Sequence, residues 1–148
     1  MSARGLAICV LVMLALTACD TPVASVENPL SDQCWFVSDS LSLSWENTDA
    51  DRQLFASCQF ADAYEFSNIY LWIEVLSPSG KSWKRPLEYD LMDEKGNWFG
   101  KGEAHRGLAL PLTLKGELTE KGKYTFRLTH HMQDNRLCGI ESIGLEIR

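Results

Sequence analysis

The chain has few basic residues for its length. Among 148 residues, 14 are Lys or Arg and 20 are Asp or Glu, so the formal net charge at pH 7 is −6. Nucleic-acid-binding proteins present basic patches to the phosphates, so this balance argues against that class. The sequence also has no phosphate-binding glycine loop and no Gly-x-Ser-x-Gly elbow for a catalytic serine. We therefore expect no nucleic-acid partner, no small-molecule substrate and no catalytic residue.

Metal ligands are equally sparse. There are three histidines, and none has partners at zinc-ligand spacing. His130 and His131 are adjacent, and in a strand their side chains would point to opposite faces, so they cannot easily serve one metal. Asp134 could approach one of them, and His105 stands alone. We expect no metal and no cofactor.

The longest hydrophobic run, Leu6 to Leu16, is shorter than the roughly 20 residues that a membrane-spanning helix needs. Arg4 precedes it and Leu-Thr-Ala-Cys19 ends it, which predicts a cleaved export signal over residues 1–18. The tetrapeptide resembles the lipobox of bacterial lipoproteins, which implies that Cys19 is the lipid attachment and that the mature protein stays on a membrane. The alternative is an ordinary signal peptide that happens to end near a cysteine.

The rest of the chain is long enough for one domain with a sizeable core. Residues 19–32 combine the lipidated cysteine with a small, polar, proline-containing stretch, which is typical of a flexible tether. We expect the folded domain over residues 33–148.

From residue 33 onward, apolar and polar residues alternate with a period of two, as in strands with one buried face. The segments predicted from this pattern are 34–37, 41–45, 54–60, 70–75, 87–91, 108–114, 124–129 and 143–147. Short strands separated by turn residues predict an all-β domain, a single antiparallel β-sandwich of about seven to nine strands. Pro111 cannot donate to a ladder, so we expect its strand at a sheet edge or bulged there.

Five cysteines are present, of which Cys9 lies in the predicted signal and Cys19 would carry the lipid. Cys34, Cys58 and Cys138 would lie beyond the inner membrane, where disulfides persist. Their odd number leaves at least one thiol unpaired. We expect Cys34 to pair with Cys58, because both fall in neighbouring N-terminal strands. The alternative is buried free cysteines, which behave as small hydrophobic residues.

Five tryptophans leave a second interpretation of function open; they are Trp35, Trp45, Trp72, Trp83 and Trp98. Aromatic side chains on a sandwich face can stack on sugars, so a carbohydrate-binding lipoprotein of the cell envelope is the alternative. The competing explanation is that the tryptophans fill the core and interfaces of a small domain. An enzyme is the third class, because a glycosidase carboxylate pair leaves no local sequence signature.

Three stretches in the C-terminal two thirds of the chain carry a family resemblance. They are residues 68–73 with 77–80, residues 96–102, and a longer set that comprises 122–126, His131, Met132, Asn135, Leu137, 139–141 and 143–145. These stretches resemble the GldH family of gliding motility lipoproteins from Bacteroidetes. The family commonly has Arg where Gln133 stands and Pro where Cys138 stands, and these departures concern contacts of that loop rather than the fold.

The resemblance implies a non-enzymatic lipoprotein of the gliding machinery and of the secretion apparatus tied to it. Its partners would be the membrane, through the lipid anchor, and other motility or secretion proteins. We expect the outer membrane, with the domain facing the periplasm. Related proteins also occur in Bacteroidetes that do not glide, so motility of the organism does not follow.

The loop from His131 to Leu137, between the last predicted strands, is the candidate partner contact. Its polar residues are His131, Gln133, Asp134, Asn135 and Arg136. The core does not demand this composition, and loops on a rigid scaffold commonly carry recognition. The competing interpretation is a structural turn, in which Met132 and Leu137 close the end of the sandwich.

Overall fold

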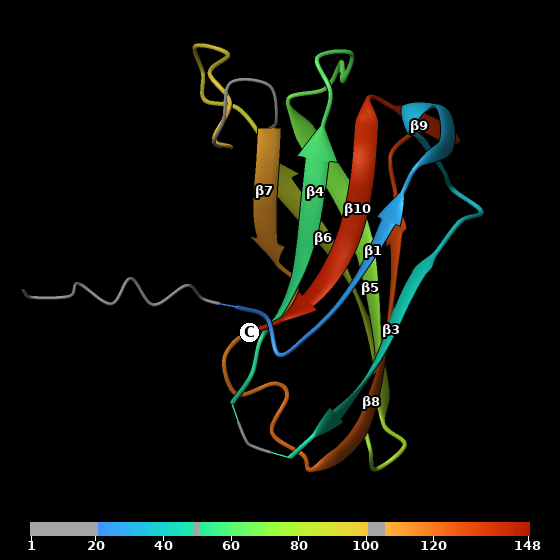
Figure 1. Cartoon of the computed structure of the whole chain (residues 1–148), viewed down its shortest axis with the longest axis vertical. Helices are drawn as coiled ribbons and strands as arrows, with labels where there is room; N and C mark the ends of the chain where they lie inside the picture. The colour runs from blue at the N-terminus through green and yellow to red at the C-terminus, as the bar shows by residue number, and fades with distance from the viewer. Residues whose placement is uncertain (1–20, 49–50, 101–105) are drawn as a thin grey trace, which may run out of the picture.

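The computed structural model describes residues 21–48, 51–100 and 106–148, which form ten β-strands and one short 3-10 turn, η1 (Ser31–Gln33). All named strand pairs are antiparallel. The two larger sheets pack face to face around one hydrophobic core (Figure 1). The predicted fold class, a single antiparallel β-sandwich, is confirmed.

One sheet has four strands in the order β1–β10–β4–β7. Their bounds are β1 (Ala24–Pro29), β4 (Leu54–Phe60), β7 (Arg106–Pro111) and β10 (Ile140–Ile147). In β4, alternate side chains from Leu54 to Phe60 are completely buried, because every second residue of a strand faces the core. Pro111 lies in an edge strand, as the sequence predicted.

The facing sheet has the order β3–β8–β5–β6. Its strands are β3 (Leu41–Asn47), β5 (Asn68–Leu76), β6 (Ser82–Asp90) and β8 (Gly122–His130). The apolar positions of β5 and β8 alternate as predicted and join the buried cluster of β4 and β10. The edge strand β6 instead alternates between half-buried and exposed residues, because only one neighbour covers it.

A short ribbon at one end of the sandwich joins β2 (Cys34–Phe36) to β9 (Arg136–Cys138) (Figure 1). Trp35 and Leu137 are paired in this ribbon, and both side chains are buried in the common core. The ribbon is therefore packed onto the sandwich rather than projecting from it.

Two strands were not expected from the sequence. The predicted tether over residues 19–32 is wrong where β1 lies, because Ala24–Pro29 pairs with β10 and places Ala24 and Val26 against the core. β1 covers what would otherwise be the open edge of β10, and open edges are sites of unwanted pairing. The strand β9, with three residues, is the other addition. The domain thus has ten strands, eight in the two sheets of the sandwich and two in the ribbon, and it begins before residue 33.

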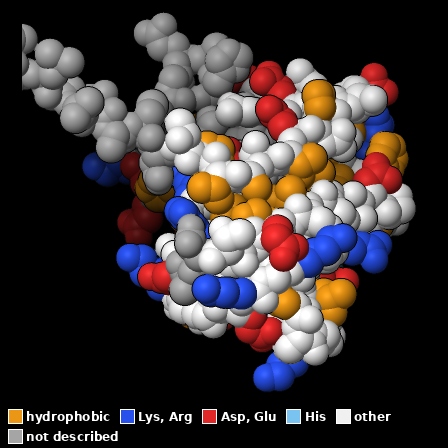
Figure 2. All heavy atoms as spheres, turned by 60° about the horizontal axis from the view of Figure 1, so that its bottom comes forward, with side chains coloured by type: hydrophobic (Ala, Val, Ile, Leu, Met, Phe, Trp, Pro, Cys, Tyr) orange, Lys and Arg blue, Asp and Glu red, His pale blue; other side chains and the backbone are white. Residues whose placement is uncertain are grey.

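Both ends of the described chain lie at the same end of the β1–β10–β4–β7 sheet (Figure 1). The Val23 amide donates to the Ile147 carbonyl at 2.8 Å, and the backbones of Gln53 and Arg148 bond to each other at 3.0 Å. Thr113 belongs to the same end, because its hydroxyl accepts a hydrogen bond from the Leu54 amide. Figure 2, in which the bottom of Figure 1 comes forward, shows hydrophobic side chains gathered in a band among charged ones.

Candidate functional site

The predicted contact loop connects β8 to β9 and is fixed at both of its ends. The His131 amide donates to the Tyr70 carbonyl at 2.8 Å, and the Tyr70 amide donates to the Met132 sulfur at 3.3 Å. At the other end, the Asn135 carbonyl accepts a hydrogen bond from the Val37 amide at 2.8 Å. The loop is therefore tied to β5 on one side and to the residue after β2 on the other.

The side chains of this loop divide into an exposed and a buried set. The exposed set contains all five predicted contact residues, His131, Gln133, Asp134, Asn135 and Arg136. Leu137 is completely buried and Met132 packs partly against the core, as the structural interpretation requires. Arg136 and Leu137 already belong to β9, so the loop proper ends at residue 135. The arrangement thus combines a structural turn with a polar surface free to meet a partner.

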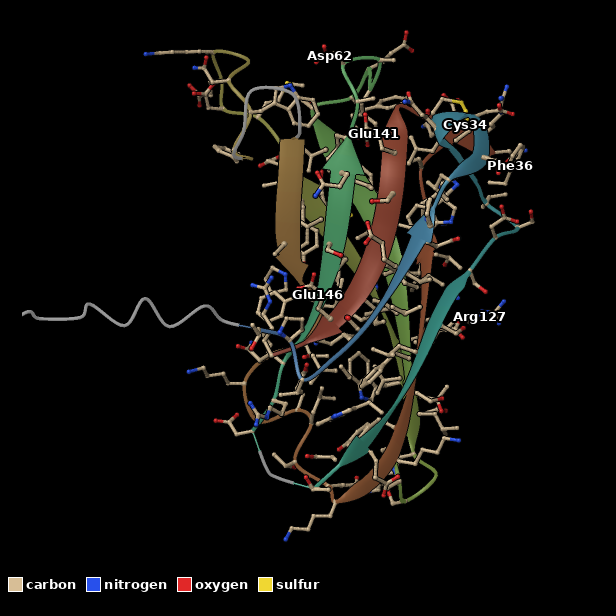
Figure 3. The ribbon with its side chains drawn as sticks, viewed as in Figure 1. Cys34, Phe36, Asp62, Arg127, Glu141 and Glu146 are labelled. Atoms are coloured by element: carbon tan, nitrogen blue, oxygen red, sulfur yellow. A yellow bond between two sulfur atoms is a disulfide. The ribbon has the colours of Figure 1, made fainter. Side chains whose placement is uncertain are left out.

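The predicted disulfide between Cys34 and Cys58 is wrong, because Cys34 is bonded to Cys138. These two cysteines lie opposite each other in the β2–β9 ribbon, whereas Cys58 sits in β4 with its side chain in the core. Burial raises the pKa of the Cys58 thiol to about 12, so it stays protonated and unreactive. Figure 3 shows Cys34, with its sulfur, at the end of the sandwich that carries the ribbon.

Two exposed apolar residues lie beside the loop and were not singled out from the sequence. Phe36 and Val37 are 45% and 43% exposed, and the Arg136 guanidinium lies 5.7 Å from the centre of the Phe36 ring. We call the exposed loop residues 131 and 133–136 together with Phe36 and Val37 the contact surface. An apolar centre with a polar and charged rim is the usual composition of a protein interface.

A hollow of about 410 Å³ adjoins the contact surface. Its lining residues are Phe66, Asn68, Tyr70, His131, Met132 and Gln133. We call it the Tyr70 hollow. Sequence reasoning found its loop residues but missed those from β5 and the segment before it, because nothing local marks two strands as neighbours.

The two adjacent histidines differ in burial, and only His130 belongs to β8. His131 is exposed, whereas His130 is buried with its ring centre 5.2 Å from that of Trp35. Burial lowers the pKa of His130 because the charged imidazolium would lose its hydration. In the described part of the chain, no three His, Cys, Asp or Glu side chains are placed to hold a metal ion. His105 lies outside the described residues.

The tryptophans mainly serve packing. Trp35 is completely buried, and Trp45, Trp83 and Trp98 pack partly against the core. Trp72 is half-buried on β5, where Lys84 lies 4.8 Å above its ring. No tryptophan of the described chain is thus presented as a bare stacking platform.

The predicted signal segment and Cys19 lie outside the described residues. Within the described ranges, no helix is long and apolar enough to cross a membrane.

Comparisons with known proteins identify the family. The profile of the GldH lipoprotein family matches residues 23–147, which is most of the chain. A protein of Christiangramia forsetii named "Gliding motility lipoprotein GldH homolog" is 27% identical over 123 residues, covering 76% of each chain. Among solved structures, the VP2 subviral particle of infectious bursal disease virus matches with a TM-score of 0.38 and 12% identity. That match covers 99% of this chain but 37% of the viral one, and its score is too low to support an argument. The family profile, which spans almost the whole folded domain, shows that the chain belongs to the GldH lipoprotein family.

Proposed function

We propose that the protein is a non-enzymatic binding component of the gliding motility machinery and of the protein secretion apparatus associated with it. Lipid on Cys19 would hold it at the outer membrane, with the domain facing the periplasm. The contact surface would bind a protein of that machinery. The observation that carries the proposal is this exposed, polar and partly apolar surface on a rigidly held loop.

The position of the contact surface relative to the N-terminus supports this role. The chain enters the fold at Val23, beside Ile147, whereas the ribbon and its loop adjoin Ile140 at the other end of β10. An eight-residue strand spans about 26 Å, so the contact surface is held roughly that far from the end where the lipid would be attached. A partner could therefore reach it while the protein stays anchored.

The end that receives the N-terminus is suited to face the membrane. Val23 and Leu114 are 52% and 65% exposed, and Leu114 follows Thr113, which is bonded to this end of β4. Moving exposed apolar side chains from water to a lipid surface costs little free energy. Restriction to a membrane also raises the effective concentration of partners on the same membrane, so each contact can be weak.

The disulfide supports an exported location. Structural disulfides form and persist outside the reducing cytosol, in the periplasm or at the cell surface. The Cys34–Cys138 bond thus agrees with an envelope protein whose signal is removed on export. Membrane fractionation with protease protection would test the outer membrane and the periplasmic side.

Crosslinking in the organism's own membranes tests the proposed contact. The lipidated protein would be recovered after crosslinking, and the double variant Gln133→Ala/Arg136→Ala compared with the wild type. Both side chains are exposed, so the free energy of unfolding should change by no more than about 0.5 kcal/mol per site. The variant should lose the crosslinked motility or secretion protein, together with secretion or gliding.

A matched control removes an exposed arginine elsewhere. Arg127 lies on β8, on the outer face of the β3–β8–β5–β6 sheet (Figure 3), and Arg127→Ala should keep the crosslinked partner. A stable double variant with full recovery of the partner would show that the loop is only a turn. If Arg127→Ala lost the crosslinked partner equally, the contact would lie on the outer face of the β3–β8–β5–β6 sheet instead.

A further inference from the structure

The Tyr70 hollow exists because two neighbouring strands part at this point. β5 pairs with β6 along its whole length, from Asn68 to Leu76, but pairs with β8 only from Leu71 onward. Past His130, the place beside Asn68 and Tyr70 is taken by the loop instead of by a strand. The hollow is therefore built into the topology and does not depend on one mobile side chain.

Hydrogen bonds and ring contacts hold several of the lining residues in place. Asn68 donates to the Glu88 carboxylate at 3.1 Å, and the His131 ring packs edge-on against Trp72 with ring centres 5.3 Å apart. Met132 accepts the Tyr70 amide through its sulfur, and Phe66 packs against Tyr64 at 5.7 Å between ring centres. A site whose groups are already positioned loses less conformational entropy when a ligand binds.

The lining has the composition of a site for an uncharged polar ligand. It combines two aromatic rings, two primary amides, an imidazole and a thioether, and the lining residues include no carboxylate, ammonium or guanidinium group. Amides both donate and accept hydrogen bonds, as sugar hydroxyls do, and the rings offer a surface for the C–H face of a pyranose. The volume falls within the roughly 300–1,000 Å³ of small-molecule sites.

We propose that the Tyr70 hollow binds an uncharged pyranose ring of an envelope glycan.

Other ligand chemistries fit the hollow less well. An anion would meet Glu88 and Asp90, which lie opposite Tyr70 and Asn68 on β6, and the net charge of the protein is negative. A cation would find the Glu88 carboxylate beside the hollow already accepting hydrogen bonds from Asn68 and Tyr70. A wholly apolar ligand would cover the Gln133 amide without offering it a hydrogen bond, which is costly.

This site goes beyond the proposed machinery role, and it shares His131 and Gln133 with the contact surface. The sugar would occupy the hollow, whereas the partner protein would cover Phe36, Val37 and Arg136. A sugar-binding site at the membrane-distal end could attach the domain to a polysaccharide layer while the lipid holds the opposite end.

Calorimetric titration of the full lipidated chain, in a detergent without a sugar headgroup, tests the proposal. The probes are chitotetraose, for the N-acetylated sugars of peptidoglycan, and mannotetraose, for hexose polysaccharides. Saturable binding of either probe, in the millimolar range or tighter, supports the site, and the preferred probe identifies the source. Tyr70→Ala and Gln133→Ala should each weaken that binding about tenfold, which corresponds to about 1.4 kcal/mol.

Phe36→Ala is the matched control, because Phe36 is an exposed aromatic residue outside the hollow. It should leave the sugar affinity unchanged. Gln133→Ala keeps the test valid if Tyr70→Ala fails to fold, since Gln133 is an exposed loop residue. Binding of neither probe, or binding that survives both hollow variants, overturns the proposal. Loss of the crosslinked protein in Tyr70→Ala without any sugar binding would assign the hollow to the protein partner.

Discussion

Cys34 and Cys138 face each other in the β2–β9 ribbon, and the disulfide between them joins residues 104 positions apart in the chain. Cys34 follows the first strand and Cys138 comes just before the last one. The bond therefore links an N-terminal strand to a C-terminal strand of the folded domain, next to the contact surface. This relationship links the stability of the fold to the shape of the proposed binding site.

Removal of the disulfide should destabilise the domain. Replacing both residues, Cys34→Ala/Cys138→Ala, should lower the free energy of unfolding by about 2–5 kcal/mol, because the unfolded chain regains the freedom that the closed loop denied it. Denaturant unfolding without reductant measures the difference. Reductant should then lower the stability of the wild type and of Cys58→Ala, but not that of the double variant. A double variant as stable as the wild type would contradict a structural role for the bond.

Gly139 should tolerate no side chain. Its φ is +83°, and a Cβ there would lie 2.4 Å from the Tyr64 backbone nitrogen. Gly139→Ala should therefore cost at least about 2 kcal/mol, since backbone strain and a clash with fixed backbone add up. Gly96 has a similar φ of +81° but no atom within 4 Å of the same position, so Gly96→Ala should cost about 1 kcal/mol. Equal melting temperatures for the two variants would contradict this explanation.

The strands that the sequence predicted correctly are those with one face in the core. β4, β5 and β8 alternate because buried apolar side chains must face one way, and this requirement is local to each strand. β1 could not be found in this way, because it is an edge strand whose Glu27, Asn28 and Pro29 are exposed. β9 is too short to show a period. Both depend on a partner strand far away in the sequence.

The site was predictable in part for the same reason. The loop is one continuous stretch, so its polar composition was visible in the sequence. The disulfide, the proximity of Phe36 to Arg136 and the Tyr70 hollow all depend on pairing between distant segments. The expectation that Cys34 pairs with Cys58 rested on their closeness in the chain. The disulfide instead follows the strand register, which places Cys34 opposite Cys138.

His130 should make the stability of the domain depend on pH. Its pKa in the folded protein lies below the unfolded value of about 6.5, so the unfolded chain binds more protons in the window below that value. The free energy of unfolding should therefore fall as the pH drops from 7 towards 5, by at most about 1.4 kcal/mol per pH unit for this group. His130→Gln keeps an acceptor for the Met132 amide but cannot titrate. The free energy of unfolding of this variant should therefore change less steeply with pH. Identical slopes would exclude His130 as the cause.

The lipid anchor can be tested through two cysteines of the same N-terminal segment. Cys19→Ser removes the thiol that the lipid would modify, because the thiolate is the nucleophile and a hydroxyl is far weaker. The variant should either appear in the soluble fraction or accumulate unprocessed, as membrane fractionation and N-terminal mass analysis would report. Cys9→Ser is the matched control, since Cys9 lies inside the apolar run and should leave processing and retention unchanged. Acyl chains contribute about 0.8 kcal/mol of membrane affinity per buried CH₂, so their loss cannot be offset by the few exposed apolar residues of the domain. Unchanged processing and retention in Cys19→Ser would mean that another feature of the chain anchors it.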